Sequence, residues 1–123
     1  MTKQVAIGQA RYRLVTAERD GRWFARAEDE QTGLGFGIEC AGATDGDAVH
    51  RLSRWLEWQA AHAAALDALQ VAERAYHRTM ASSAFATPDH DAAAAELQAE
   101  ALDVLEAARV RLDEVRAQRP DTD

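Results

Sequence analysis

The stretch Thr44–Ser82, TDGDAVHRLSRWLEWQAAHAAALDALQVAERAYHRTMAS, decides the fold because it has the pattern of one long helix. It contains no Pro and no Gly beyond its third residue, and apolar residues recur at three- and four-residue steps from Val49 to Tyr76. Thr44 stands at the N-cap position, with Asp47 three residues later as in a capping box. The sequence therefore predicts an amphipathic helix over residues 44–82.

Three segments ahead of this helix show the alternation of β-strands, at residues 10–17, 22–28 and 34–40. The first two are joined by Asp20-Gly21, a dipeptide that suits the positive φ angles of a tight hairpin. We expect a three-stranded antiparallel meander over residues 10–42. The apolar row of its third strand, which would contact the helix, is Leu34, Phe36, Ile38 and Cys40.

A second helix is predicted over residues 89–118, after a turn at Thr87-Pro88-Asp89. Residues 119–123 are expected to fray. The predicted fold class is α+β, a single domain over residues 1–123 in which the meander precedes two helices that form an antiparallel hairpin. The apolar stripe of the second helix is Ala94, Leu97, Ala101, Val104 or Leu105, Ala108, Leu112 and Val115.

The predicted long helix exceeds the predicted sheet in length. A helix of residues 45–81 would be roughly 55 Å long at about 1.5 Å per residue, whereas strands of about seven residues span roughly 23 Å. An Ala-rich seam between two helices also removes little apolar surface from water. We therefore expect self-association, most simply as a dimer with a four-helix arrangement, and keep a slim monomer as the alternative. The predicted interface residues are Leu66, Leu69, Tyr76, Leu97, Leu105 and Leu112.

The composition excludes several classes of protein. The chain of 123 residues is 47% hydrophobic and 28% charged, which is typical of a folded, soluble domain. Residues 1–44 carry six basic and six acidic side chains, whereas residues 45–123 carry eight basic and fifteen acidic ones, so the net charge of −7 belongs to the helical part. Such a surface repels nucleic acids and anionic membranes. The sequence has no apolar run of signal-peptide or membrane-span length, and its single cysteine fits a reducing cytoplasm.

The candidate chemical groups do not predict an active site. Glu73 and His77 are one helical turn apart, and His90 could approach them from the interhelix turn, but a metal needs three or four converging ligands. Cys40 fits a buried packing residue better than a nucleophile. The glycines of residues 33–37 lack the spacing of a phosphate-binding loop. We expect no catalysis, no metal and no cofactor.

Two short motifs carry a family resemblance. They are Asp20-Gly21-Arg22-Trp23-Phe24-Ala25 and Gly42-Ala43-Thr44-Asp45-Gly46-Asp47-Ala48-Val49. Residues 11–57 thereby resemble the N-terminal domain of HicB-type antitoxins, in which a DG-x-aromatic-x-A strand precedes a G-x-T-x-x-E/D-A-L helix start. The resemblance implies a sheet-and-helix fold and, as an alternative function, an antitoxin or regulator that neutralises a small basic partner protein. Residues 30–33 replace the family's Pro-Gly-Cys loop, and an acidic helical hairpin stands where a DNA-binding module is common.

Overall fold

The protein has an α+β fold, seen in a computed structural model that describes residues 2–7, 10–33, 35–84 and 91–122. Four strands and two helices follow one another along the described part of the chain. The chain divides into two compact units. Unit 1 comprises Met1–Ala60 and Gln118–Asp123, and unit 2 comprises Ala61–Ala117.

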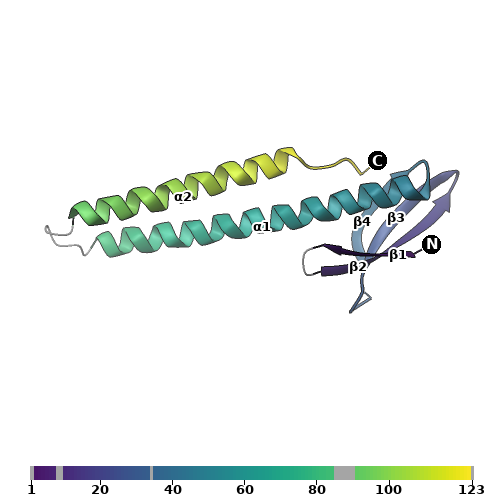
Figure 1. Cartoon of the computed structure of the whole chain (residues 1–123), viewed down its shortest axis with the longest axis horizontal. Helices are drawn as coiled ribbons and strands as arrows, with labels where there is room; N and C mark the ends of the chain where they lie inside the picture. The colour runs from purple at the N-terminus through teal and green to yellow at the C-terminus, as the bar shows by residue number, and fades with distance from the viewer. Residues whose placement is uncertain (1, 8–9, 34, 85–90, 123) are drawn as a thin grey trace. The chain divides into compact units, whose positions relative to one another are not determined.

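Unit 1 is built on a four-stranded antiparallel sheet in the order β1-β2-β3-β4 (Figure 1). Three of its strands confirm the predicted meander, whereas the sequence analysis missed the first, which pairs with β2 from Thr2↔Val15 to Ile7↔Ala10. This edge strand is stabilised by pairing with a neighbour, which local sequence does not show. The strands are β1 Thr2–Ile7, β2 Ala10–Arg19, β3 Arg22–Asp29 and β4 Gly35–Gly42.

The β2–β3 connection is the predicted tight hairpin. Arg19 pairs with Arg22, so the loop contains only Asp20 and Gly21, whose φ angles are 53° and 81°. Two consecutive positive φ angles are typical of a type I′ turn, whose twist matches that of the flanking strands. The Asp-Gly dipeptide therefore fixes the pairing of the two central strands.

Helix α1, Asp45–Ser83, begins where the sequence predicts. The hydroxyl oxygen Oγ1 of Thr44 accepts a hydrogen bond from the N–H of Asp47 at 3.1 Å, which confirms the N-cap. Just before it, Gly42 lies so close to the helix that an added Cβ would stand 2.5 Å from the nitrogen of Ala48. A glycine at this position lets the last strand turn directly into the helix.

The core of unit 1 lies between the sheet and the first turns of α1 (Figure 1). Leu14 of β2 and Leu52 of α1 are fully buried, and each such leucine contributes roughly 1.5–3 kcal/mol. Cys40 is buried and Ile38 is partly buried against this cluster, as predicted for their row, whereas the side chains of Leu34 and Phe36 lie outside the described residues. The buried cluster consists of Leu14, Ala25, Ala27, Cys40, Ala48, Leu52, Trp55 and Leu56.

The C-terminal tail belongs to unit 1 instead of fraying as predicted. The N–H of Ala41 in β4 donates a hydrogen bond to the carbonyl of Thr122 at 2.9 Å. The guanidinium of Arg119 lies 4.9 Å from the ring centroid of Trp55 and 5.9 Å from that of Trp58, within the range of cation–π attraction. These contacts order the tail, and they join residues too far apart in sequence for local pattern to predict.

Candidate functional site

Unit 2 is a helical hairpin formed by residues 61–83 of α1 and by α2, Asp91–Ala117 (Figure 1). This agrees with the predicted antiparallel pair of helices. The predicted turn at Thr87-Pro88-Asp89 and the predicted start of the second helix lie outside the described residues. Its observed end, Ala117, falls one residue before the predicted one.

The two helices share a seam of buried and half-buried residues that recur at alternating steps of four and three. Such steps form the heptad pattern by which paired helices keep one stripe in contact. In α1 the seam consists of His62, Ala65, Leu69, Ala72, Tyr76 and Thr79. In α2 it consists of Ala94, Gln98, Ala101, Leu105, Ala108, Leu112 and Val115.

Small residues alternate with larger ones along both seams. Ala65 and Ala72 are buried, with 6% and 3% of their surface exposed, and so are Leu105 and Leu112, at 4% and 3%. Alternation of this kind lets a large side chain on one helix fill the space left by a small one on the other. Such a seam allows close packing, but the alanines in it bury little apolar area.

The six predicted interface residues differ in their exposure. Leu105 and Leu112 are buried within the chain, so they are not available to a partner in this conformation. Leu66, Leu69 and Tyr76 are half-buried. Leu97, which was placed on the same stripe as Leu105, is 58% exposed. It lies one residue before the seam, and one residue turns a helix by about 100°.

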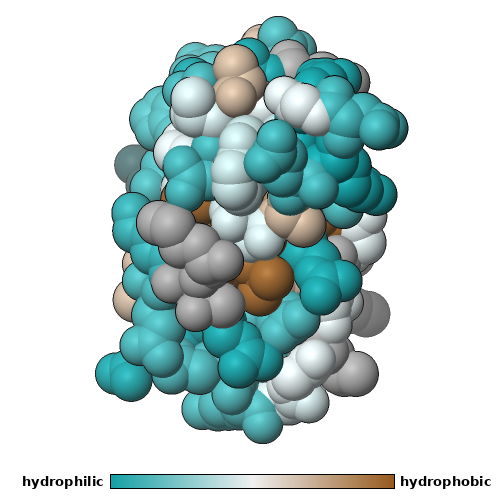
Figure 2. All heavy atoms as spheres, turned by 90° about the vertical axis from the view of Figure 1, so that its right-hand side faces the viewer, coloured by the Kyte–Doolittle hydropathy of each residue, from teal (hydrophilic) through white to brown (hydrophobic). Residues whose placement is uncertain are grey.

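The exposed large hydrophobic side chains of the described residues all lie in unit 2. None of the six has less than 37% of its surface exposed, although each would be more stable away from water. By contrast, the face drawn in Figure 2 is mostly hydrophilic, with only small hydrophobic areas. The exposed residues are Val71, Met80, Leu97, Leu102, Val104 and Val110.

Three of these residues gather on one side of the hairpin. In α2, Leu97 and Val104 each stand immediately before a seam residue. In α1, Ala68 occupies the same heptad position, immediately before Leu69. In an antiparallel pair the positions that precede the seam flank it on the same side. Val71 follows Ala68 by three residues and extends this side across α1. We call this surface the Val104 face, composed of Ala64, Ala68, Val71, Leu97, Val104 and Ala107, all exposed.

The opposite flank of the seam is less apolar. Met80 and Leu102 lie there, at 43% and 37% exposure. The same heptad position is occupied by a charged residue one heptad away on each helix, Glu73 on α1 and Arg109 on α2. Val110 is 57% exposed and stands apart from both flanks. Among the described residues, the Val104 face carries three of the exposed large hydrophobic side chains against two on the opposite flank, with Glu100 lying between Leu97 and Val104.

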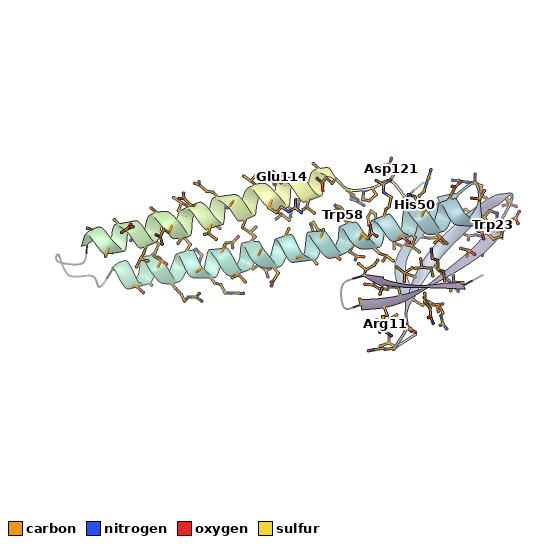
Figure 3. All side chains as sticks on the ribbon, viewed as in Figure 1. Arg11, Trp23, His50, Trp58, Glu114 and Asp121 are labelled. Atoms are coloured by element: carbon orange, nitrogen blue, oxygen red, sulfur yellow. The ribbon has the colours of Figure 1, made fainter. Side chains whose placement is uncertain are left out.

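The sheet of unit 1 carries a basic outer face whose charges are partly paired. Arg13 lies 2.6 Å and Arg26 3.6 Å from Glu28, and Arg19 is paired with Glu39. Figure 3 shows Arg11 on the side of the sheet away from α1. Arginines outnumber carboxylates among these residues, so the face is a secondary candidate for binding an anionic surface.

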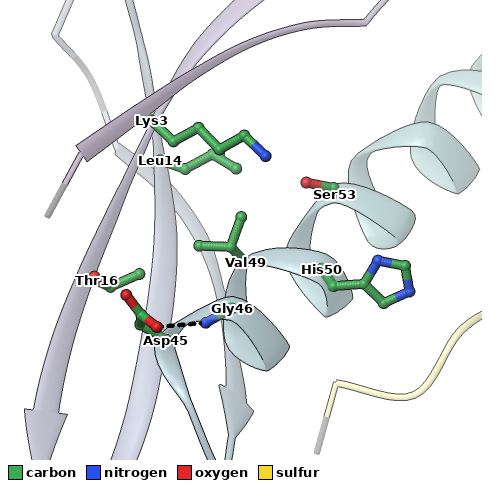
Figure 4. A pocket seen from close by; sticks show the side chains of 8 residues that line it. All are labelled: Lys3, Leu14, Thr16, Asp45, Gly46, Val49, His50 and Ser53. Atoms are coloured by element: carbon green, nitrogen blue, oxygen red, sulfur yellow. Dashed lines mark hydrogen bonds between the residues drawn. The ribbon is translucent and has the colours of Figure 1, made fainter.

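A pocket of about 350 Å³ lies between the edge of the sheet and the start of α1 (Figure 4). Leu14 and Val49 form its apolar part, and Lys3 extends across it. Asp45 accepts a hydrogen bond from the N–H of Gly46 at 2.8 Å, which uses this carboxylate to cap its own helix. The imidazole of His50 points away from the centre. Thr16 and Ser53 add two hydroxyl groups to its lining.

The candidate metal and thiol residues are also placed. No group of three or more His, Cys, Asp or Glu side chains in the described part of the chain could hold a metal ion. Glu73 is half-buried and His77 is exposed, whereas His90 lies outside the described residues. Cys40 is buried in the core of unit 1, as expected for a packing residue. Neither helix, within its described residues, is apolar enough over a sufficient length to cross a bilayer.

Comparisons of the chain with protein-family models, curated proteins and solved structures found no match, so the resemblance to HicB-type antitoxins stays a prediction from two short motifs.

Proposed function

We propose that this protein is an interaction and assembly module that associates with a second copy of itself through the Val104 face of its helical hairpin. The observation that carries the proposal is the gathering of exposed large hydrophobic side chains in unit 2, three of them on one side of the seam. Contiguous exposed apolar surface on a soluble protein is typical of an interaction site.

The size of the hairpin supports this proposal. Residues 61–83 span roughly 34 Å at about 1.5 Å per residue, and two helices side by side are about 20 Å wide. One side of the hairpin therefore presents roughly 700 Å², close to the approximately 800 Å² that each partner contributes to a stable interface. The alanines of this face allow close approach, and the larger Val71, Leu97 and Val104 supply the apolar area.

A second copy is the simplest partner because a two-fold axis brings the same apolar face of two chains together. Four helices would then surround the side chains that a two-helix hairpin leaves in water. Both copies would gain the same burial, without a second gene product.

The test is a matched pair of variants, Val104→Asp and Val110→Asp. The two valines are 59% and 57% exposed on the same helix, but only Val104 belongs to the proposed interface. Light scattering should give the unmodified protein and Val110→Asp twice the chain mass of 13.5 kDa, and Val104→Asp a single chain mass. Circular dichroism should show that both variants keep their helices. A single chain mass for the unmodified protein at all concentrations, or an unchanged mass for Val104→Asp, would contradict the proposal.

A second candidate function is the antitoxin-like regulator implied by the resemblance. The observation that favours it is the charge of residues 61–117, which carry ten acidic and five basic side chains and would attract a basic protein. Its test is co-expression with the product of a neighbouring reading frame that encodes a small basic protein. A stoichiometric complex that dissociates at high salt would support this function, and separate elution of the two proteins at low salt would contradict it.

A further inference from the structure

We infer that the two copies meet with their α2 helices antiparallel, about a two-fold axis that passes between Val104 and Ala107. The inference rests on the proposed self-association and adds its polarity and register. It comes from the order of residues along the side of α2 that belongs to the Val104 face.

The four central residues on this side form a symmetric pattern, with Leu97 three residues before it and Glu114 three residues after it. Val104 and Ala107 stand at the centre, Glu100 lies four residues before Val104, and Arg111 lies four residues after Ala107. All four share one side of the helix because they are separated by steps of three and four residues, and all four are exposed. The pattern is symmetric in spacing and opposite in charge.

Only an antiparallel arrangement turns this pattern into attraction. Reversing one helix about the centre places Glu100 opposite Arg111 of the partner subunit, and the two-fold axis generates the pair twice. A parallel arrangement in register would instead place like charges opposite each other at both positions, which is unfavourable. Charge at these positions therefore selects orientation, while the apolar centre provides the burial.

Charge along the whole of α2 is distributed in the same direction as in this pattern, with acidic side chains first and arginines later. Residues 91–108 contain five acidic side chains and no basic one, whereas residues 109–117 contain three arginines and two acidic side chains. An antiparallel pair brings the acidic half of each helix towards the more basic end of the other. Long-range attraction then favours the same orientation as the local pair.

Arg111 has a competing partner within its own chain. Its Nη1 lies 3.7 Å from a carboxylate oxygen of Glu114, and both side chains are 58% exposed. An exposed pair one turn apart contributes little to stability, so this interaction is easily exchanged for one with a partner subunit.

Charge-reversal variants test the polarity. Glu100→Arg and Arg111→Glu should each raise the dimer dissociation constant about 3- to 30-fold, because each places like charges opposite each other at two symmetric positions. The double variant should return it to within about threefold of the unmodified protein, since the pairs are restored with exchanged partners. Asp103→Arg, which lies away from the stripe, serves as the control, and we expect it to leave the dissociation constant within about threefold. Sedimentation equilibrium at low salt gives the constants.

The outcomes separate this inference from the proposed function. If the unmodified protein is a monomer, both fail together. If the protein is a dimer that Val104→Asp dissociates, but the single charge reversals have no effect or the double variant is as weak as they are, the antiparallel register is wrong and the association stands. Far-ultraviolet circular dichroism identifies any variant that has lost its helices. In that case Arg111→Lys, which keeps the charge, should still form the dimer.

Discussion

The two units exclude water from their apolar side chains in different ways. In unit 1 a sheet and a helix form two layers, and Leu14 and Leu52 between them are fully buried. In unit 2 two helices meet along one seam, and valines and leucines outside it remain in water. The difference shows that two layers containing a sheet can enclose a core, whereas a lone hairpin encloses only one stripe. Apolar residues beyond that stripe need another surface.

The largest expected effect is a difference in the free energy of unfolding between two leucine-to-alanine variants, one in each unit. Leu52→Ala should lower the free energy of unfolding by about 2–5 kcal/mol, because it leaves a cavity in a closed core. Leu97→Ala should change the unfolding free energy of the monomer by no more than about 0.5 kcal/mol, because the side chain is 58% exposed. Urea denaturation measured at low protein concentration gives both values.

Association should respond in the opposite order. Leu97→Ala is expected to weaken the dimer, whereas Leu52→Ala should leave its dissociation constant unchanged under conditions where the protein is folded. If Leu97→Ala were as destabilising to the monomer as Leu52→Ala, the side chain would belong to a closed core and the contrast between the units would fail.

A smaller effect tests the seam of unit 2 by enlarging a residue instead of shrinking one. Ala72 is 3% exposed on the seam, so Ala72→Leu should force the helices apart and lower the unfolding free energy by about 1–3 kcal/mol. Ala63 is exposed on the same helix, and Ala63→Leu should change the unfolding free energy by no more than about 0.5 kcal/mol. Equal values for the two variants would show that the hairpin does not depend on close packing of small residues.

The sequence predicted the features that local chemistry determines. The Asp20-Gly21 turn, the Thr44 cap and the long helix all follow from residues adjacent in the chain, and the structure confirms them. It did not predict β1, because an edge strand depends on pairing with β2. Nor did it predict the tail on β4, because Ala41 and Thr122 are distant in sequence.

For a geometric reason, the sequence analysis did not settle which residues of α2 are buried against α1 and which are exposed. The sequence left Val104 and Leu105 as alternatives, and the structure buries Leu105 while leaving Val104 59% exposed. Strict alternation of four- and three-residue steps starting at Ala94 reaches Leu105 and excludes both Leu97 and Val104. That alternation was present in the sequence, and it distinguishes Leu105 in the seam from Val104 beside it.

The smallest expected effect concerns the loop after β3 and should be confined to unit 1. The N–H groups of Thr32 and Gln31 donate hydrogen bonds to Oδ1 of Asp29 at 3.0 and 2.8 Å, and these bonds lower the pKa of that carboxyl below its ordinary value of 3.8. Since the folded state favours the charged form, the carboxylate stabilises unit 1 above pH 3.8, and this contribution is lost as the pH falls through the lowered pKa. An NMR titration of Asp29 should give a midpoint below 3.8, and Asp29→Asn should make unit 1 slightly less sensitive to acid.

The dimer dissociation constant at neutral pH should not respond to Asp29→Asn, because the loop belongs to the unit with the closed core. A change in that constant would mean that a residue of unit 1 also affects association, which is assigned here to unit 2.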